Sequence, residues 1–128
     1  MREILFKAKR KDSGRWVEGL LWKKKYNSNK IFISCFPDED DNEEAFVVDS
    51  KTICQYTGLT DKNGCKIWEN DIVRLDEDLY IVTWEEDDAM FALEDVGIVE
   101  HFSNVDSKWC EVVGNKFDNP ELLEAGEA

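Results

Sequence analysis

The repeated alternation of short β-forming runs with turn residues constrains the fold of this chain more than any other feature. Runs rich in valine, isoleucine and aromatic residues recur along the sequence, and glycine, asparagine, aspartate or proline separates them. A spacing of roughly 8–12 residues between such runs is typical of sandwiches and small barrels. The sequence therefore predicts a mainly β fold, a pseudo-barrel or sandwich of short antiparallel strands with at most one or two short helical turns.

The individual strands follow from this pattern. They are predicted at residues 4–9, 15–22, 31–33, 45–56, 72–75, 79–84, 90–93, 97–102 and 109–117. Asp49-Ser50 either interrupts the fourth run or caps a short turn within it. Residues 86–95 also fit helical spacing, so this segment is a contender for a helix. Near the C-terminus, PELLEA predicts one helical turn with Pro120 in the first position, where proline is tolerated.

The first two strands form a predicted hairpin around the turn signal Lys11–Gly14. In the second strand Trp16, Leu20 and Trp22 fall on one face, because side chains of a strand alternate between its two faces. Glu18 interrupts that apolar face.

The stretch QYTGLTDKNGCKIWENDIVRL (55–75) is the most regular passage of the chain. Two turns, Asp61–Gly64 and Glu69–Asp71, separate its β-forming runs, and Asn-Gly favours the positive φ that tight turns need. We expect these turns to set the register of the flanking strands. The candidate core residues of this stretch are Tyr56, Leu59, Ile67, Trp68, Ile72 and Val73.

The length favours a single domain over residues 1–128, with an acidic loop at 38–44 and a C-terminal tail at 121–128. No apolar run approaches the ~18–20 residues that cross a bilayer. The opening MREILFKAKRKDSGRW carries charges where a signal peptide needs an apolar stretch. We therefore expect a cytoplasmic protein with no membrane association.

The cysteines do not have the spacing of a zinc site. The chain has four cysteines, no C-x-x-C and one histidine. Thiols scattered through a cytoplasmic protein are usually free, and several of them buried. We expect free cysteines and no metal.

The charge is strongly polarised along the chain. Residues 1–30 hold ten Lys/Arg against three acids, a net charge of +7, whereas residues 31–128 hold six against 26, a net charge of −20. Such a chain can attract its own kind head to tail, or attract a basic partner. A solvated acidic surface that keeps a small protein soluble is the simpler alternative.

No motif indicates catalysis or a cofactor. Asp38 and Asp40 fit the first and third positions of a calcium loop, but Glu43 stands in the sixth, where glycine is needed. His101 lies on a predicted strand without a nucleophile signature. A phosphate-binding glycine loop is also missing. The sequence therefore predicts a protein that is not an enzyme and that needs no cofactor.

Two kinds of partner fit the charges. Basic residues interleaved with aromatic ones in the first 30 residues could bind single-stranded nucleic acid, but the acidic remainder opposes a polyanion. The acidic surface could instead imitate DNA and occupy a basic host protein. A protein partner, or a second copy of the chain, is therefore favoured over nucleic acid. The candidate partner-contact residues are Lys23, Lys24, Lys25, Asp38, Asp40 and Asp41.

Three blocks of the chain resemble the YopX family of phage and prophage proteins: REILFKAKRK (2–11), QYTGLTDKNGCKIWENDIVRL (55–75) and EVVGNKFDNPELL (111–123). Trp68 stands where the family usually has a smaller aromatic residue and Asn70 where it usually has glycine. Asparagine is the common substitute for glycine in a left-handed turn. The resemblance implies a largely β pseudo-barrel, a phage or prophage origin, a bacterial host cell and no established activity. We expect a non-enzymatic module for protein–protein interaction or assembly.

Overall fold

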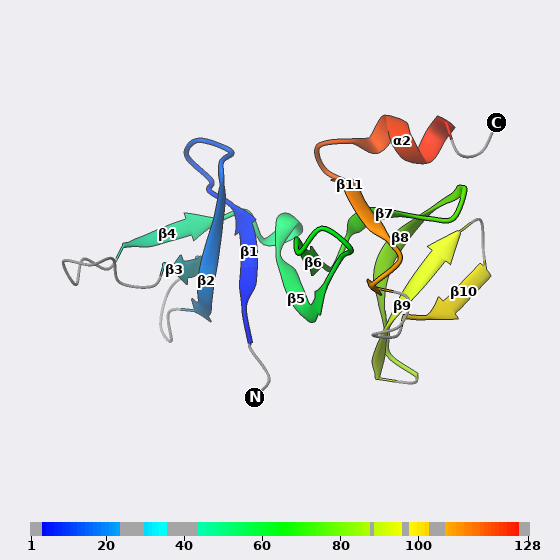
Figure 1. The fold of residues 1–128 in the computed structure, drawn as a ribbon. Helices are drawn as coiled ribbons and strands as arrows, with labels where there is room; N and C mark the ends of the chain where they lie inside the picture. The colour runs from blue at the N-terminus through cyan, green and yellow to red at the C-terminus, as the bar shows by residue number, and fades with distance from the viewer. Residues whose placement is uncertain are drawn as a thin grey trace. The chain divides into compact units, whose positions relative to one another are not determined.

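The described part of the chain consists mostly of short antiparallel strands. The computed structural model describes residues 4–23, 30–35, 44–87, 89–95, 98–102 and 107–125. The strands are β1 (Phe6–Lys9), β2 (Trp16–Lys23), β3 (Ile31–Ser34), β4 (Ala45–Val48), β5 (Cys54–Thr60), β6 (Lys66–Trp68), β7 (Asp71–Leu75), β8 (Asp78–Glu85), β9 (Met90–Asp95), β10 (Ile98–His101) and β11 (Glu111–Asn115). Short helical elements are the 3₁₀ turn η1 (Ser50–Thr52) and the helix α2 (Pro120–Ala125) (Figure 1). The predicted mainly β fold of short antiparallel strands is confirmed.

The strands belong to two compact units, which we call unit 1 (Met1–Tyr56) and unit 2 (Thr57–Ala128). β5 contributes to both, because residues 54–56 belong to unit 1 and residues 57–60 to unit 2.

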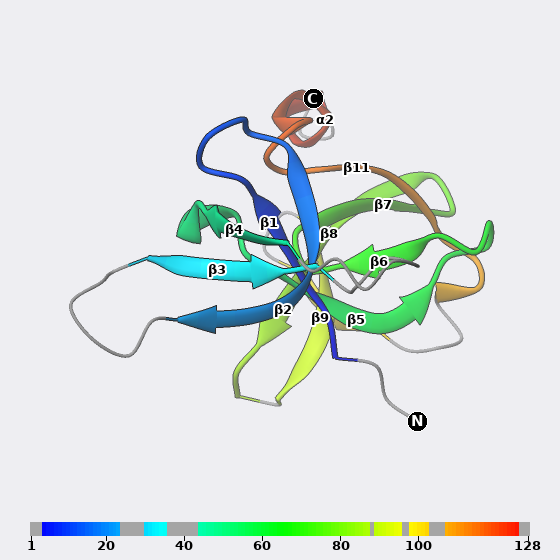
Figure 2. The same ribbon diagram turned by 90° about the vertical axis from the view of Figure 1, so that its left-hand side faces the viewer.

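In unit 1 the strands follow the order β4-β3-β2-β1-β5, and the pairs between them are antiparallel (Figure 2). The sheet curls until the end of β1 reaches β4, where Arg10 and Val48 form an isolated bridge. Next to this bridge, Lys11 N–H donates to the carbonyl oxygen of Val47 over 2.9 Å. A single bridge is not a ladder, so the described part of unit 1 is a curled sheet and not a closed barrel.

The core of unit 1 lies on the concave side of this curl. Ala8, Ile33 and Val48 are its buried centre. Half-buried apolar side chains surround them: Phe6, Val17, Leu21, Ile31 and Ile53. Gly19 allows β2 and β3 to approach each other closely, because a Cβ atom at this position would collide with the backbone carbonyl of Ser34.

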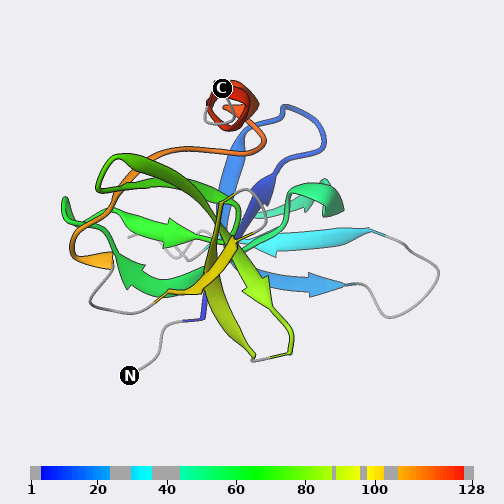
Figure 3. The ribbon, with the colours of Figure 1, turned by 90° about the vertical axis from the view of Figure 1, so that its right-hand side faces the viewer.

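Unit 2 is built on a five-stranded sheet in the order β10-β9-β8-β7-β11 (Figure 3). β7 to β10 form a meander, and β11 returns to pair with β7 through a register shift between Val112 and Gly114. The end of β5 pairs with β6. The buried cluster of this unit is Ile67, Val73, Val82, Leu93, Phe102 and Cys110.

The two turns of the central block have the predicted conformations. In the first, Gly64 has φ +81° and its N–H donates to the carbonyl oxygen of Asp61 over 3.0 Å. In the second, Asn70 has φ +73°, so asparagine does occupy the left-handed position. The predicted core residues Tyr56, Ile67, Trp68, Ile72 and Val73 are buried, and Leu59 is half-buried against the core of unit 2.

Asp61 also joins the first turn to β11. Its carboxylate accepts backbone N–H groups from Asn63 and Cys65 on one oxygen and from Val112 on the other, each over 2.9 Å. The N–H of the neighbouring Lys62 donates to the carbonyl oxygen of Cys110 over 3.1 Å. This turn therefore lies alongside the start of β11 and forms hydrogen bonds with its backbone, as a neighbouring strand would.

The structure also decides the remaining alternatives for secondary structure. Residues 90–95, which also fitted a helix, form strand β9, and Ala89 with φ +50° makes the turn before it. Asp49 caps η1 by accepting the N–H of Lys51 over 3.1 Å, so the fourth run is interrupted by a capped turn. α2 begins at Pro120 as predicted. None of the described helices is long and apolar enough to cross a membrane.

Candidate interaction surface

The outer face of unit 1 carries a group of apolar side chains. Cross-strand partners point to the same side of a sheet. Leu20 pairs with Ser34, which pairs with Ala45, and Trp22 pairs with Phe32, which pairs with Val47. These two rows run across three strands on the side opposite to the core. We call these six residues the aromatic face.

Trp22 and Phe32 give this face a fixed geometry. Their rings stack with centroids 4.3 Å apart and an interplanar angle of 9°. The indole N–H of Trp22 donates to the hydroxyl of Ser34 over 2.7 Å. Trp22 is nevertheless 41% exposed and Leu20 53% exposed. The aromatic face is thus an ordered apolar surface open to solvent.

Two lysines lie over the ring of Trp16, which is next to the aromatic face. Lys9 pairs with Trp16 across β1 and β2, so both share the outer side of the sheet. The ammonium group of Lys7 lies 4.7 Å from the ring centroid of Trp16, and that of Lys9 lies 5.4 Å away. Such cation–π contacts contribute about 0.5–1 kcal/mol each at exposed sites.

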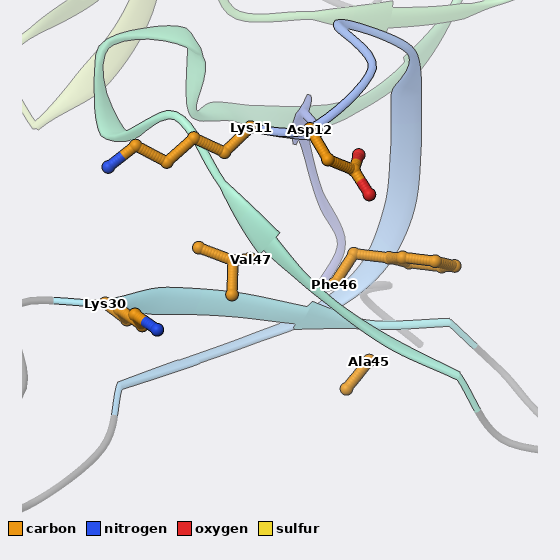
Figure 4. Close-up of a pocket in the computed structure, with 6 residues that line it drawn as sticks. All are labelled: Lys11, Asp12, Lys30, Ala45, Phe46 and Val47. Atoms are coloured by element: carbon orange, nitrogen blue, oxygen red, sulfur yellow. The ribbon is translucent and has the colours of Figure 1, made fainter.

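A pocket of about 420 Å³ lies at the β4 end of the aromatic face (Figure 4). It is lined by Lys11, Asp12, Lys30, Ala45, Phe46 and Val47. In Figure 4, Val47 lies between the side chains of Lys11 and Lys30. Since Ala45 and Val47 also belong to the aromatic face, the pocket continues both of its rows.

The charges around the pocket are unevenly balanced. The guanidinium of Arg10 donates two hydrogen bonds, of 2.9 and 2.7 Å, to the carboxylate of Asp12. It also lies 4.1 Å from the ring centroid of Phe46. The hydrogen bond from Arg10 lowers the pKa of Asp12. Lys11 has no ion pair with any described residue. The pocket therefore places two lysines, and one carboxylate that is paired with Arg10, next to an apolar wall.

The structure places few of the partner-contact residues predicted from the sequence. Lys23 is the exposed last residue of β2, beside Trp22. Lys24, Lys25, Asp38, Asp40 and Asp41 lie outside the described residues. Sequence reasoning missed the lysines of the pocket and the apolar rows beside it. The signal was present in β2, where Leu20 and Trp22 stand on the same face as the charged Glu18.

The acidic segments of unit 2 do not form one cluster. Asp76–Asp78 lies at the start of β8, whereas Glu85–Asp87 lies at its end. At about 3.4 Å per residue, the two ends of an eight-residue strand are roughly 24 Å apart. These two groups of acids are therefore separated along β8, and imitation of DNA remains a prediction from charge.

The other candidate residues form no site among the described side chains. The backbone of His101 ends β10 opposite Ala92. Within the described ranges, no three His, Cys, Asp or Glu side chains are grouped as metal ligands. The cysteines are free thiols, as expected, and Cys54 and Cys110 are buried.

Comparison with known proteins supports the fold and identifies the family. The chain is similar to a protein described as "Crystal structure of protein EF1440 from Enterococcus faecalis", with 23% identity and a TM-score of 0.62 over 96% of this chain and 99% of that one. At this identity the likeness shows the fold alone. No curated protein matches the chain. Residues 5–124 match the family described as YopX protein. The chain therefore belongs to the YopX family.

Proposed function

We propose that the protein is a non-enzymatic module for protein–protein interaction or assembly, encoded by a phage or prophage and acting in the cytoplasm of a bacterial host cell. Membership of the YopX family supports the phage or prophage origin. The aromatic face is the observation that carries the interaction role.

An ordered apolar surface is costly to leave in water. Burial of a large apolar side chain contributes roughly 1.5–3 kcal/mol, and Leu20 and Trp22 both keep about half of their surface exposed. Their neighbours Phe32 and Ser34 hold the indole of Trp22 in place, so little side-chain entropy is left to lose on binding. An exposed apolar patch bordered by charged residues is typical of a binding surface.

The charge distribution supports association between copies of the chain. Residues 1–56 hold eleven Lys/Arg against ten acids, a net charge of +1, and residues 57–128 hold five against nineteen, a net charge of −14. The basic side chains of unit 1 and the acidic ones of unit 2 are complementary. A head-to-tail contact between copies uses this complementarity.

The chemistry of the pocket supports binding rather than catalysis. Its one carboxylate, Asp12, is engaged by Arg10. The remaining lining is two lysines, an alanine, a phenylalanine and a valine. General acid–base catalysis requires a group that is free to exchange a proton with a substrate. Two ammonium groups beside an apolar wall instead suit a partner that carries carboxylates.

Light scattering coupled to gel filtration tests this proposal. We expect an average mass above that of the monomer in about 0.05 M salt and a decline towards the monomer in about 0.5 M salt, because salt screens exposed charges. A protein that stays monomeric at every salt and protein concentration would contradict assembly through its own charges.

A further inference from the structure

The interaction proposed above can be assigned to particular surfaces of the two units. We propose that the aromatic face and the adjoining pocket dock the end of β8 and the start of the β8–β9 turn, Trp84, Glu86 and Asp87, of a second copy of this chain; below, the β8–β9 turn means these residues. This assignment rests on the proposed assembly function and specifies both sides of the contact.

The receiving surface combines an apolar tract with a cationic end. The row Trp22, Phe32 and Val47 crosses three strands and leads into the pocket. Lys11 and Lys30 flank Val47 at that end (Figure 4). Its occupant must therefore carry an exposed apolar group beside carboxylates, a few ångströms apart on one short segment.

One described segment of unit 2 has this chemistry. Among the described residues, the exposed large apolar side chains of unit 2 are Trp84 and Trp109. Trp109 follows the exposed Lys108, which gives it the wrong charge for a basic pocket. Trp84 is 41% exposed and is followed, at the tip of the hairpin, by the exposed Glu86 and Asp87. The β8–β9 turn is therefore the complementary surface.

The geometry of this turn also suits docking. Trp84 packs edge-on against Phe91 across β8 and β9, with ring centroids 5.0 Å apart. The hairpin thus holds its indole at a fixed place behind the two acids. An aromatic anchor that is already ordered, together with a charged tip, is typical of residues that dominate binding energy.

The contact is heterologous, because unit 1 of one copy meets unit 2 of the next. A pair of copies then keeps one free receiving surface and one free turn, so growth continues into a ring or a chain of copies. Sedimentation velocity should show species larger than a dimer as protein concentration rises.

Single charge reversals test the assignment. Lys11→Glu and Glu86→Lys should each weaken self-association by about tenfold or more, since each sets two like charges against one another. Trp22→Ser and Trp84→Ser should do the same by removing an aromatic anchor. Lys51→Glu and Trp109→Ser are the matched controls, because they change an exposed lysine and an exposed tryptophan elsewhere and should leave association unchanged.

Mixing the two charge-reversed proteins is the decisive step. In an equimolar mixture, the carboxylate introduced by Lys11→Glu in one protein can face the ammonium group introduced by Glu86→Lys in the other. Association should therefore return in the mixture, although each protein alone associates more weakly than the wild type. Far-ultraviolet circular dichroism of each variant confirms that it is folded.

The outcomes separate this inference from the proposed function. A wild-type protein that is monomeric under all conditions would contradict both the proposed assembly function and this inference. If Lys11→Glu and Glu86→Lys associate as strongly as the wild type, the assembly function is kept and these surfaces are overturned. Binding of a single-stranded oligothymidylate to the wild type, lost in Trp22→Ser and Lys11→Glu, would assign the aromatic face to nucleic acid and also overturn the inference.

Discussion

Asp61 is the residue whose side chain connects two distant parts of unit 2. It is 5% exposed, and its carboxylate accepts N–H groups from its own turn and from β11. Burial by itself would raise the pKa of this carboxyl, but the hydrogen bonds from Val112, Cys65 and Asn63 outweigh it and hold the pKa below its ordinary value. The charged form of Asp61 is thus the form that the fold requires.

Replacement of Asp61 by asparagine should therefore destabilise the protein. Asp61→Asn offers one acceptor oxygen and turns an amide N–H₂ towards backbone donors, so we expect a loss of about 1–3 kcal/mol in the free energy of unfolding at pH 7. Urea denaturation measures this loss. Glu77→Gln, in an exposed turn, is the control and should change stability by less than about 0.5 kcal/mol.

The same variant should respond differently to acid. A carboxyl with a lowered pKa in the folded state contributes stability that is complete above its unfolded pKa of about 4 and is lost as the pH falls through the folded value. Wild-type stability should therefore fall below about pH 4 more steeply than that of Asp61→Asn. Parallel acid profiles for the two proteins would show that Asp61 is not linked to folding in this way.

The four cysteines differ in accessibility, which predicts their reactivity. Cys65 is exposed, whereas Cys54 and Cys110 are buried. Burial, together with Glu44 and Glu18, raises the pKa of the half-buried Cys35 thiol and reduces its reactive thiolate fraction. We expect a disulfide reagent to label Cys65 first, Cys35 more slowly, and the buried pair only on unfolding. Rapid labelling of Cys54 in the native protein would contradict the described core.

At the scale of elements, β2 shows what an alternating pattern predicts and what it does not. The pattern placed Trp16, Leu20 and Trp22 on one face, and the register with β1 and β3 confirms this. It did not reveal that this face is the one exposed to solvent. The choice depends on the residues of other strands that cover the opposite face of β2, among them Ala8 and Ile33, which lie far apart along the chain.

Local chemistry made other elements predictable. The turns at Gly64 and Asn70 could be predicted from the sequence, because a positive φ at one position favours glycine or asparagine there independently of distant residues. The pocket could not be predicted in this way. Lys11, Lys30 and Val47 come from three segments that meet only when the sheet curls, so no short pattern records their proximity.

Gly19→Ala should accordingly disturb the pairing of β2 with β3. A methyl group cannot fit against the backbone of Ser34, so the strands must separate, at a cost of about 1–3 kcal/mol. Thermal or urea unfolding measures this cost. Glu18→Ala, on the exposed face of the same strand, should remain within about 0.5 kcal/mol of the wild type.

At the scale of the whole molecule, each unit contains a buried hydrophobic cluster of its own. The core of unit 1 centres on Ala8, Ile33 and Val48, and no residue of that cluster belongs to the cluster of unit 2 around Ile67. β5 is the strand that both units contain. We therefore expect a core substitution to perturb mainly the unit that carries it.

Two matched substitutions test this independence. Ile33 and Ile67 are both fully buried, so Ile33→Ala and Ile67→Ala should each cost about 2–5 kcal/mol. In native-state hydrogen exchange, Ile33→Ala should accelerate amides of β1 to β4 most, and Ile67→Ala those of β7 to β9. Equal acceleration throughout the chain would mean that the molecule opens only as one cooperative body.

Two outer strands, β4 and β11, have some of their outward backbone groups occupied, which affects how this protein can aggregate. On β4, Lys11 N–H and the carbonyl of Lys9 occupy outward groups of Val47 and Asp49, and on β11 the Asp61 turn does the same. An outer strand with open backbone groups is a template for foreign strands and for amyloid. Because these positions are already taken, a partner that approaches β4 or β11 there meets side chains instead of open backbone groups. At these two edges the restriction makes recognition depend on sequence and disfavours pairing with foreign strands.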